Sequence, residues 1–357
     1  MKKPKIRFKG YQEDWEQRKF ADFTWDAGKR NKEDLDLEPY AITNEHGFIR
    51  QRDAHDDFGY MKDTDRKAYN IVQPNSFAYN PARINVGSIG YYKGVENVIV
   101  SSLYEVFQTD NYVNDRFLWH WLKSDEFPRW IEKLQEGSVR LYFYYDKLCE
   151  CQLYMPSLEE QEKIATFLDD LDHLITLHQR KCEETKTLKK YMLQKMFPQN
   201  GHSVPEIRFS GFTEDWEQRK LVDLVDRVTR KNQDLVSELP LTISAQYGLI
   251  DQNEFFDKRV ASKDVSGYYL IENGEFAYNK STSTDAPWGA IKRLDRYKNG
   301  VLSTLYIVFG IKENNPVDSD FLVSYYSTNL WHKGIHEIAA EGARNHGLLN
   351  IAPADFF

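Results

Sequence analysis

The sequence is poor in the residues that mark several common protein classes. Its 357 residues include only three cysteines, 12 prolines and 19 glycines, which excludes collagen-like and linker-dominated chains. The cysteines form no C-x-x-C pair, so neither a disulfide framework nor a zinc site is indicated. No run of about 18 apolar residues predicts a membrane span, and no apolar stretch follows the basic N-terminus as in a signal peptide. We therefore expect a cytoplasmic protein.

The sequence also lacks the motifs of the common catalytic sites. It has no Pro-Pro dipeptide for an adenine methyltransferase loop, no phosphate-binding G-x-x-x-x-G-K-S/T loop, no G-x-S-x-G elbow and no H-E-x-x-H metal motif. Carboxylates such as Asp53, Asp56 and Asp57 are scattered, as on a solvated surface. We predict no catalytic residue and no metal site, so the chain is not an enzyme by itself. An enzyme with an unrecognised site is the least favoured alternative.

What is present predicts a folded, acidic protein. Apolar residues make up 41% and aromatic residues 14% of the chain, enough for packed cores. The formal net charge is −8, which argues against tight DNA binding by the chain alone. It does not exclude a basic face, because charges act on phosphates only within a Debye length of about 8–10 Å.

The chain repeats itself. Residues 4–20 return as residues 205–221 with 12 of 17 positions identical, and both copies contain E-D-W-E-Q-R-K. Later segments keep a similar offset, as in F-A-Y-N at 77–80 and 276–279. The sequence therefore predicts a duplicated domain rather than a solenoid, whose period is about 20–50 residues. The copies differ between these matched segments, which fits either two different binding surfaces on one scaffold or drift after duplication.

Each copy has the pattern of a mixed α/β domain. We expect a first domain over 1–156, a long helix over 157–197 and a second domain over 198–357. Short apolar runs predict strands at 97–101, 102–108, 141–145 and 305–310. Helices are predicted at 115–124, 125–134, 319–327 and 330–339.

The joining segment predicts one long helix with an apolar seam. Ser157 is placed as N-cap, with Glu160 three residues later as the second member of a capping box. About 40 residues give a helix of roughly 60 Å, and a seam on it calls for a partner helix rather than a plain spacer. The predicted helix-packing residues are Leu168, Leu171, Ile175, His178, Cys182, Leu188 and Met192. His178 is read as a tolerated seam residue.

Loop-like stretches in both copies mix amide, basic and aromatic residues. Asn can pair with adenine, Arg and Lys with guanine, and Lys with phosphate. Such loops are also ordinary turns, but they occur in both copies. The candidate DNA-binding residues are Lys29, Arg30, Asn80, Arg83, Lys93, Arg140, Arg230, Lys231, Asn279, Lys280, Lys292, Arg293 and Arg344.

Together these segments resemble the specificity subunit of type I restriction–modification systems over essentially the whole length. The most specific are the paired W-E-Q-R-K segments, F-A-Y-N-P-A-R-I-N-V-G-S-I-G from residue 77, E-G-A-R-N-H-G-L-L-N-I from residue 341, and P-S-L-E-E-Q-E-K-I at the start of the long helix.

The resemblance implies two α/β target recognition domains, each reading one half of a bipartite double-stranded DNA site. The coiled-coil helix between them sets the spacing. The resemblance also implies two adenine-N6 methylation subunits that use S-adenosylmethionine, and two restriction subunits that use ATP and Mg²⁺. No cofactor is expected on this chain.

One departure concerns the second conserved helix of the family, which the given sequence does not contain. We therefore expect a form that stops before this helix, with self-dimerisation through residues 157–197 or weaker recruitment of the second methylation subunit. The alternative from another class is a non-DNA-binding coiled-coil scaffold or inactive phase-variation product. Salt-dependent DNA binding separates the two.

Overall fold

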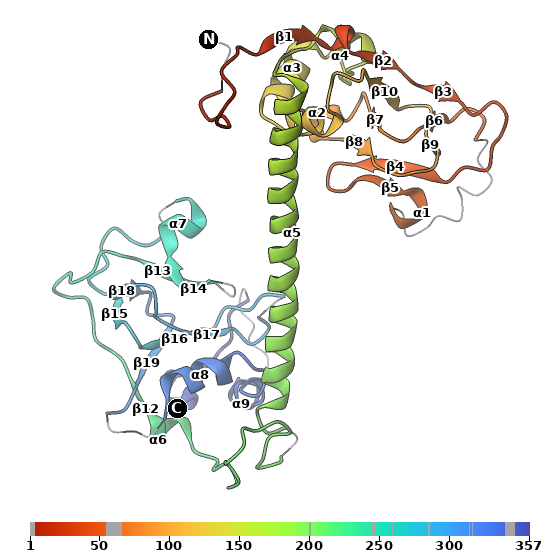
Figure 1. The fold of residues 1–357 in the computed structure, drawn as a ribbon. Helices are drawn as coiled ribbons and strands as arrows, with labels where there is room; N and C mark the ends of the chain where they lie inside the picture. Colours follow the sequence, from red (N-terminus) through yellow and green to blue (C-terminus); the bar gives the residue numbers. More distant parts are fainter. Residues whose placement is uncertain are drawn as a thin grey trace. The chain divides into compact units, whose positions relative to one another are not determined.

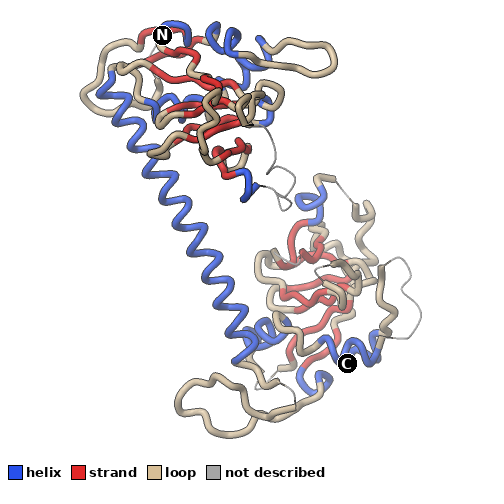
Figure 2. Tube along the Cα trace, turned by 90° about the vertical axis from the view of Figure 1, so that its right-hand side faces the viewer, coloured by secondary structure: helices blue, strands red, loops and turns tan. Residues whose placement is uncertain are grey.

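The computed structural model describes residues 4–54, 66–199, 201–244, 247–258, 260–284, 286–313, 315, 317–339 and 347–357. The chain divides into two compact units, Met1–Arg180 and Lys181–Phe357, which carry the two sequence repeats. Figure 1 shows the order of elements, and Figure 2 shows that the strands of each unit gather together with short helices beside them. The predicted mixed α/β fold with a long helix is confirmed.

The first unit contains short strands followed by three helices and the start of the long helix. Its elements are β1 (Glu16–Lys19), η1 (Phe20–Asp22), β2 (Thr24–Asp26), β3 (Lys29–Arg30), β4 (Pro39–Thr43), β5 (Gly47–Arg50), α1 (Gln51–Ala54), β6 (Asn70–Val72), β7 (Ser76–Tyr79), η3 (Ile84–Val86), β8 (Ile89–Tyr92), β9 (Val98–Val100), β10 (Glu105–Thr109), α2 (Asp115–Leu122), α3 (Glu126–Leu134), α4 (Tyr145–Glu150), β11 (Gln152–Met155) and α5 (Leu158–Lys195).

The second unit repeats most of this order. Its further elements are α6 (Leu221–Leu224), β12 (Val225–Arg227), β13 (Leu241–Ser244), β14 (Gly248–Asp251), α7 (Gln252–Phe256), β15 (Tyr269–Glu272), β16 (Phe276–Asn279), β17 (Ala290–Arg293), β18 (Asn299–Leu302), β19 (Ile307–Ile311), α8 (Ser319–Tyr326), α9 (His332–Ile338) and α10 (Pro353–Phe356).

A four-stranded antiparallel sheet is the common core of both units. Its order is β2-β10-β7-β8 in the first unit and β12-β19-β16-β17 in the second. The equivalent central strands β7 and β16 carry the same F-A-Y sequence. All three residues are buried in both strands, as expected for a strand covered on both faces. Phe77 stacks on Phe107 at 4.9 Å between ring centroids, and Phe276 stacks on Phe309 at 5.4 Å. The duplication therefore extends to core packing.

The first helix after this sheet also starts in the same way in both units. Asn114 caps α2 by accepting hydrogen bonds from the backbone N–H groups of Arg116 and Phe117. Asp318 caps α8 by accepting one from Phe321. Such caps satisfy N–H groups that have no partner within the helix, so the equivalent positions 114 and 318 fix where each helix begins.

The long helix forms over Leu158–Lys195, close to the predicted 157–197. The Ser157 hydroxyl accepts a hydrogen bond from the Glu160 N–H at 3.4 Å, which is one half of the predicted capping box. The other half is wrong, because the Glu160 carboxylate instead accepts two hydrogen bonds from the Arg7 guanidinium, both at 2.7 Å.

The predicted strand at 141–145 is also wrong. Tyr142 makes an isolated bridge to Glu136, and Tyr145 is the first residue of α4. The aromatic run L-Y-F-Y-Y instead forms a loop that places the buried Phe143 in the core of the first unit. The strands and helices predicted elsewhere overlap β9, β10, β19, α2, α3, α8 and α9.

Candidate nucleic-acid interface

The loop between β7 and β8 is built around Asn80. The Asn80 side-chain oxygen accepts a hydrogen bond from the Ala82 N–H at 3.0 Å, and the Asn80 backbone N–H donates to the Ser88 carbonyl at 3.0 Å. The Ser88 hydroxyl then donates to the Ile42 carbonyl of β4 at 2.9 Å. Gly87, at φ 85°, supplies the left-handed residue that returns the chain to β8. The loop presents the exposed Arg83 on a fixed backbone.

A second loop, residues 136–144, lies against the first. The Phe143 backbone N–H donates to the Pro81 carbonyl at 3.1 Å. Glu136 and Tyr142 close the loop with two backbone hydrogen bonds of 2.8 Å, and Arg140 is exposed at its tip beside Val139, whose exposure is 95%. The fold therefore brings two segments far apart in sequence onto one surface.

The second unit joins the equivalent loops. The Leu349 N–H donates to the Lys280 carbonyl at 3.0 Å, and Thr282 and Gly347 are joined by a backbone hydrogen bond of 2.7 Å. The Asn279 side-chain oxygen accepts from the Ser281 N–H at 3.0 Å, as Asn80 does in the first unit. Arg344, predicted to bind DNA, lies outside the described residues.

The predicted cations of the first unit are mostly available to a ligand. Among the described residues, the side chains of Lys29, Arg83 and Arg140 have no hydrogen-bond or ion-pair partner, and all three are exposed. The Lys93 ammonium lies 6.0 Å from the centre of the Tyr91 ring. Arg30 differs, because its guanidinium donates to the Ala68 carbonyl beside β3.

The predicted cations of the second unit mostly have internal partners. Arg230 contacts Glu275 at 3.0 Å and Glu272 at 3.5 Å. The Lys231 ammonium donates to the Gly267 carbonyl at 2.9 Å and lies 4.0 Å from the centre of the Tyr269 ring, and the Lys280 ammonium donates to the Ile351 carbonyl at 3.3 Å. These side chains stabilise the fold locally.

Arg293 occupies the position of Tyr91 in the other repeat. Tyr91 opposes Phe77 across the sheet and donates its hydroxyl to Asp115 at 3.1 Å, whereas Arg293 opposes Phe276 and donates to the Ser319 hydroxyl at 2.7 Å. Arg293 also pairs with Asp295 and Asp320. The same sheet-to-helix contact is therefore made by a tyrosine and a carboxylate in the first unit and by an arginine and a hydroxyl in the second. The Arg293 side chain interacts within its own unit.

Lys292 is the exception in the second unit. Its side chain is half-buried and makes no ion pair among the described residues. Burial, and then the charge of Lys189 on α5, lower the pKa of its ammonium. A half-buried ammonium beside a second cation is an unfavourable arrangement that an anion such as a phosphate would relieve.

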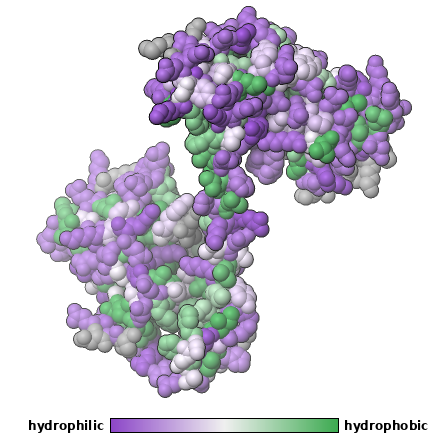
Figure 3. Space-filling model, viewed as in Figure 1, coloured by the Kyte–Doolittle hydropathy of each residue, from purple (hydrophilic) through white to green (hydrophobic). Residues whose placement is uncertain are grey.

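The predicted helix-packing residues follow one exposed stripe. Every residue from 170 to 191 of α5 is exposed, including Leu171, Ile175, His178, Cys182 and Leu188, while Leu168 and Met192 are half-buried. Figure 3 shows apolar side chains on the surface of this helix. Leu174, Leu177 and Tyr191, absent from the prediction, add to the exposed apolar surface.

Sequence reasoning also missed the contacts that hold α5 to α2. Asp169 accepts hydrogen bonds from Arg116 and pairs with His120, both at 2.9 Å. Burial by itself would raise the pKa of Asp169, but these partners and the charge of Lys93 outweigh it and lower that pKa. Positions 116 and 120 lie one turn apart on a predicted helix, but no pattern in the sequence links them to position 169, so only the folded arrangement identifies this contact.

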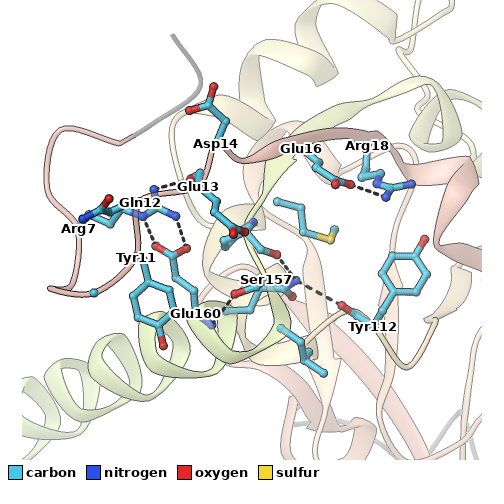
Figure 4. Close-up of a pocket in the computed structure, with 15 residues that line it drawn as sticks. Arg7, Tyr11, Gln12, Glu13, Asp14, Glu16, Arg18, Tyr112, Ser157 and Glu160 are labelled. Atoms are coloured by element: carbon cyan, nitrogen blue, oxygen red, sulfur yellow. Dashed lines mark hydrogen bonds and ion pairs between the residues drawn. The ribbon is translucent and has the colours of Figure 1, made fainter.

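A pocket of about 590 Å³ lies where the repeated N-terminal segment meets the start of α5. Figure 4 shows Arg7 pointing at Glu160, and Tyr11 and Arg18 among the side chains around the pocket. Gln161 is buried beside it and accepts from the Asn114 N–H at 2.8 Å. The polar groups of this pocket mostly contact one another, so it joins structural elements rather than presenting a catalytic set.

The described residues offer neither a cluster of metal ligands nor a membrane-spanning helix. No group of three or more His, Cys, Asp or Glu side chains there is placed to hold a metal ion. None of the helices in the part of the chain that the structure describes has the length and apolar character to span a membrane.

The comparisons with known proteins point to one family. Residues 12–187 match the model of the type I restriction modification DNA specificity domain. The chain is 28% identical over 224 residues to the specificity subunit of the type I restriction enzyme MjaVIII of Methanocaldococcus jannaschii, covering 60% of this chain and 50% of that protein. It is 24% identical over 221 residues to the putative MjaX specificity subunit of the same organism, covering 57% and 51%.

A solved structure supports the fold. The crystal structure of a type I restriction–modification S subunit from M. genitalium aligns with a TM-score of 0.51 and 14% identity, covering 94% of this chain and 81% of that chain. The chain spans about half the length of the curated relatives it matches.

Proposed function

The chain belongs to the family of type I restriction–modification specificity subunits, and we propose that it selects the DNA sequence on which such a system acts. Each repeat would read one half of a bipartite site in double-stranded DNA. The chain would perform no catalysis, because the methylation and restriction subunits would supply it. Those partners would bind S-adenosylmethionine, ATP and Mg²⁺ and would act with this chain in the cytoplasm.

One observation carries the proposal at the level of the structure. Both units join the loop after the central F-A-Y strand to a loop that follows two helices, through the bonds Phe143–Pro81 and Leu349–Lys280. The described residues of both units share this junction between the loops, while the side chains around it differ. Two unlike surfaces on one frame suit an asymmetric target, since base edges are distinguished by the side chains that meet them.

The arginine and asparagine side chains on these surfaces would have different roles in binding DNA. Arg83 and Arg140 have guanidinium groups without internal partners in the described structure, and a guanidinium can pair bidentately with guanine or with phosphate. Asn80 and Asn279 use their side-chain oxygens within their own loops, so they would shape the loops and keep only their amide N–H groups for DNA. Partner subunits would supply phosphate contacts that a chain of net charge −8 lacks.

The long helix would act as the spacer and as a docking surface for the methylation subunits. Its 38 residues correspond to about 57 Å at 1.5 Å per residue, which exceeds the separation of about 34–36 Å between half-sites one helical turn apart. The exposed stripe on it is also the surface through which two copies of the chain would self-dimerise.

Mapping of methylated adenines in genomic DNA tests the proposal. The chain is co-expressed with the methylation subunit of its own system, and the matched control is the methylation subunit alone. Adenine methylation at one bipartite, non-palindromic motif is the expected result. A palindromic bipartite motif would indicate that two copies each use one recognition domain. No methylation, together with no salt-dependent DNA binding by the complex, would favour the non-DNA scaffold.

A further inference from the structure

The tip of the loop 136–144 in the first unit exposes apolar and aromatic side chains to solvent. Val139 is 95% exposed, Leu141 is 43% exposed and Tyr144 is 48% exposed. Arg140 lies between the first two in sequence, and its side chain has no partner among the described residues. Side chains exposed in this way add little to the core, so a group of them indicates a surface that contacts another molecule.

The loop that carries Val139 has a fixed backbone. Glu136 and Tyr142 form an antiparallel bridge with two backbone hydrogen bonds of 2.8 Å. Gly137 has a φ of 136°, and a side chain at this position would place its Cβ atom 2.0 Å from the Arg140 carbonyl oxygen. Only glycine fits there, so the backbone at the tip is held in a tight turn from which Val139 projects.

The base of this loop is anchored beside the loop between β7 and β8. Phe143 is fully buried, and its backbone N–H donates to the Pro81 carbonyl at 3.1 Å. Tyr142 and Tyr144, on either side of it in sequence, stack with ring centroids 5.5 Å apart and an interplanar angle of 2°. Val139 therefore projects from the candidate nucleic-acid interface, on a loop that is closed at its base.

A closed loop of two antiparallel segments suits the major groove of DNA. Such segments lie about 4.8 Å apart before their side chains are added. The major groove is about 12 Å wide and admits a two-stranded ribbon, whereas the minor groove is only about 6 Å wide. Base edges in the major groove present hydrogen-bonding groups and one apolar group, the C5-methyl of thymine. An aliphatic side chain at the tip of the loop can favour only that methyl group.

We propose that Val139 reads a thymine. Its two methyl groups would contact the C5-methyl of one thymine in the half-site bound by the first unit, and Arg140 would contact the adjacent nucleotide. The proposal rests on the proposed DNA function, and it adds to that function a named residue and the base that this residue selects. The contact is apolar, so it complements the hydrogen bonds that Arg83 and Arg140 can donate.

The matched segment of the second repeat has a different sequence at this point. After the shared E-G pair, the first repeat continues with S-V-R and the second with A-R-N, so Arg344 stands at the position of Val139. An arginine pairs with guanine or phosphate rather than with a methyl group. We therefore expect the preference for a thymine methyl in one half-site only, and the other half-site serves as an internal control.

Removal of one methyl group from the DNA tests this contact. The probe is a labelled duplex that carries the motif found by methylation mapping. Each thymine of both half-sites, including the one opposite each methylated adenine, is replaced in turn by deoxyuridine, which lacks only the C5-methyl. Binding by the complex of the chain with its methylation subunit is measured by fluorescence anisotropy at one salt concentration. We expect one replacement, in one half-site, to weaken binding about fourfold, because one buried methyl group is lost.

Two serine variants identify the side chain. Val139→Ser removes both methyl groups, so the thymine and deoxyuridine duplexes should then bind equally, as expected when one partner of an interacting pair is absent. Its thermal transition should not change, because Val139 is almost fully exposed. The matched control is Val95→Ser, at a valine that is 91% exposed and lies beyond the other end of β8 from the loop 80–88. This control should keep the fourfold preference.

Three results would overturn the proposal. These are no loss of affinity with any deoxyuridine duplex, a preference for thymine that persists in Val139→Ser, and a preference that is lost in Val95→Ser as well. In each case the complex still binds and methylates its motif, so the proposed DNA function would stand without this contact. Absence of both binding and methylation would instead contradict the DNA function, and the thymine contact with it.

Discussion

At the residue scale, the Arg7–Glu160 pair is the contact on which the junction between the first domain and α5 most depends. Glu160 is 1% exposed and its carboxylate has Arg7 as its charged partner. Arg7→Ala would leave a buried charge unpaired, which is far more destabilising than replacing the whole pair. We expect the thermal transition of the first unit to fall by roughly 5 °C or more, as followed by circular dichroism.

A double variant and an exposed pair provide the controls. Arg7→Met with Glu160→Met removes both charges and should recover most of the lost stability. Arg129→Ala breaks an exposed pair with Glu126 and should change the transition little. A loss from Arg129→Ala equal to that from Arg7→Ala would contradict the assignment.

We expect the Lys292 side chain to lower the stability of the fold while contributing to DNA binding. Burial and the charge of Lys189 lower its pKa in the folded state, so its charged form costs stability below that pKa. The cost fades as pH rises towards the unfolded value of 10.5. Lys292→Met should therefore raise the free energy of unfolding at pH 7, by about 1 kcal/mol, and weaken DNA binding by the assembled complex. Urea unfolding and DNA titration measure the two effects, and a stabilised variant with unchanged DNA binding would remove Lys292 from the interface.

The sequence pattern selected candidate site residues, but it could not predict which groups their side chains contact. It selected Asn80 and Arg293 from their place in repeated loop-like stretches, but only Asn80 lies in a loop, since Arg293 is the last residue of β17. It could not foresee that Asn80 would bind its own backbone or that Arg293 would pair with Asp320, because those contacts depend on backbone geometry and on residues 27 positions away. The capping-box prediction failed for Glu160 for the same reason: the competing partner, Arg7, is 153 positions away.

At the element scale, periodicity predicted helices more reliably than composition predicted strands. The run from 158 to 195 has capping signals and a seam, and it forms one continuous helix. The aromatic run at 141–145 has high strand propensity, but Phe143 is drawn into the core and its backbone bonds to Pro81. Strand propensity largely reflects packing against neighbours, so it could not be judged without the fold.

The seam of α5 yields a prediction about association. Leu171 and Ile175 are exposed by 40% and 55%, so replacing them with Gln removes little packing within the chain. The variant should keep its thermal transition, and its self-association constant should fall at least about tenfold because two apolar side chains leave the interface. Sedimentation equilibrium measures this. A chain that is already monomeric at high micromolar concentration would show that the seam serves another partner.

At the scale of the whole molecule, the two repeats share structural features of the fold but differ in the side chains on their loops. Both units keep the F-A-Y strand, the capped helix after the sheet and the joined loops, although the side chains on those loops differ in type and in internal pairing. Arg83 and Arg140 are free of internal partners in the described structure, whereas Arg230 and Arg293 are not. A scaffold that keeps its frame in this way allows each recognition surface to change independently of the other.

Independent surfaces predict that damage to one of them relaxes only one half of the target. Arg83→Ala should loosen the base preference of one half-site by about 1–3 kcal/mol at the contacted position if it pairs with guanine, while the other half keeps its sequence. If Arg83 instead contacts phosphate, methylation should fall uniformly and the salt dependence of binding should become shallower by about one ion. Arg129→Ala is the matched control, since Arg129 is already paired with Glu126. Methylation mapping separates the two results, and loss of preference in both halves at once would contradict the modular arrangement.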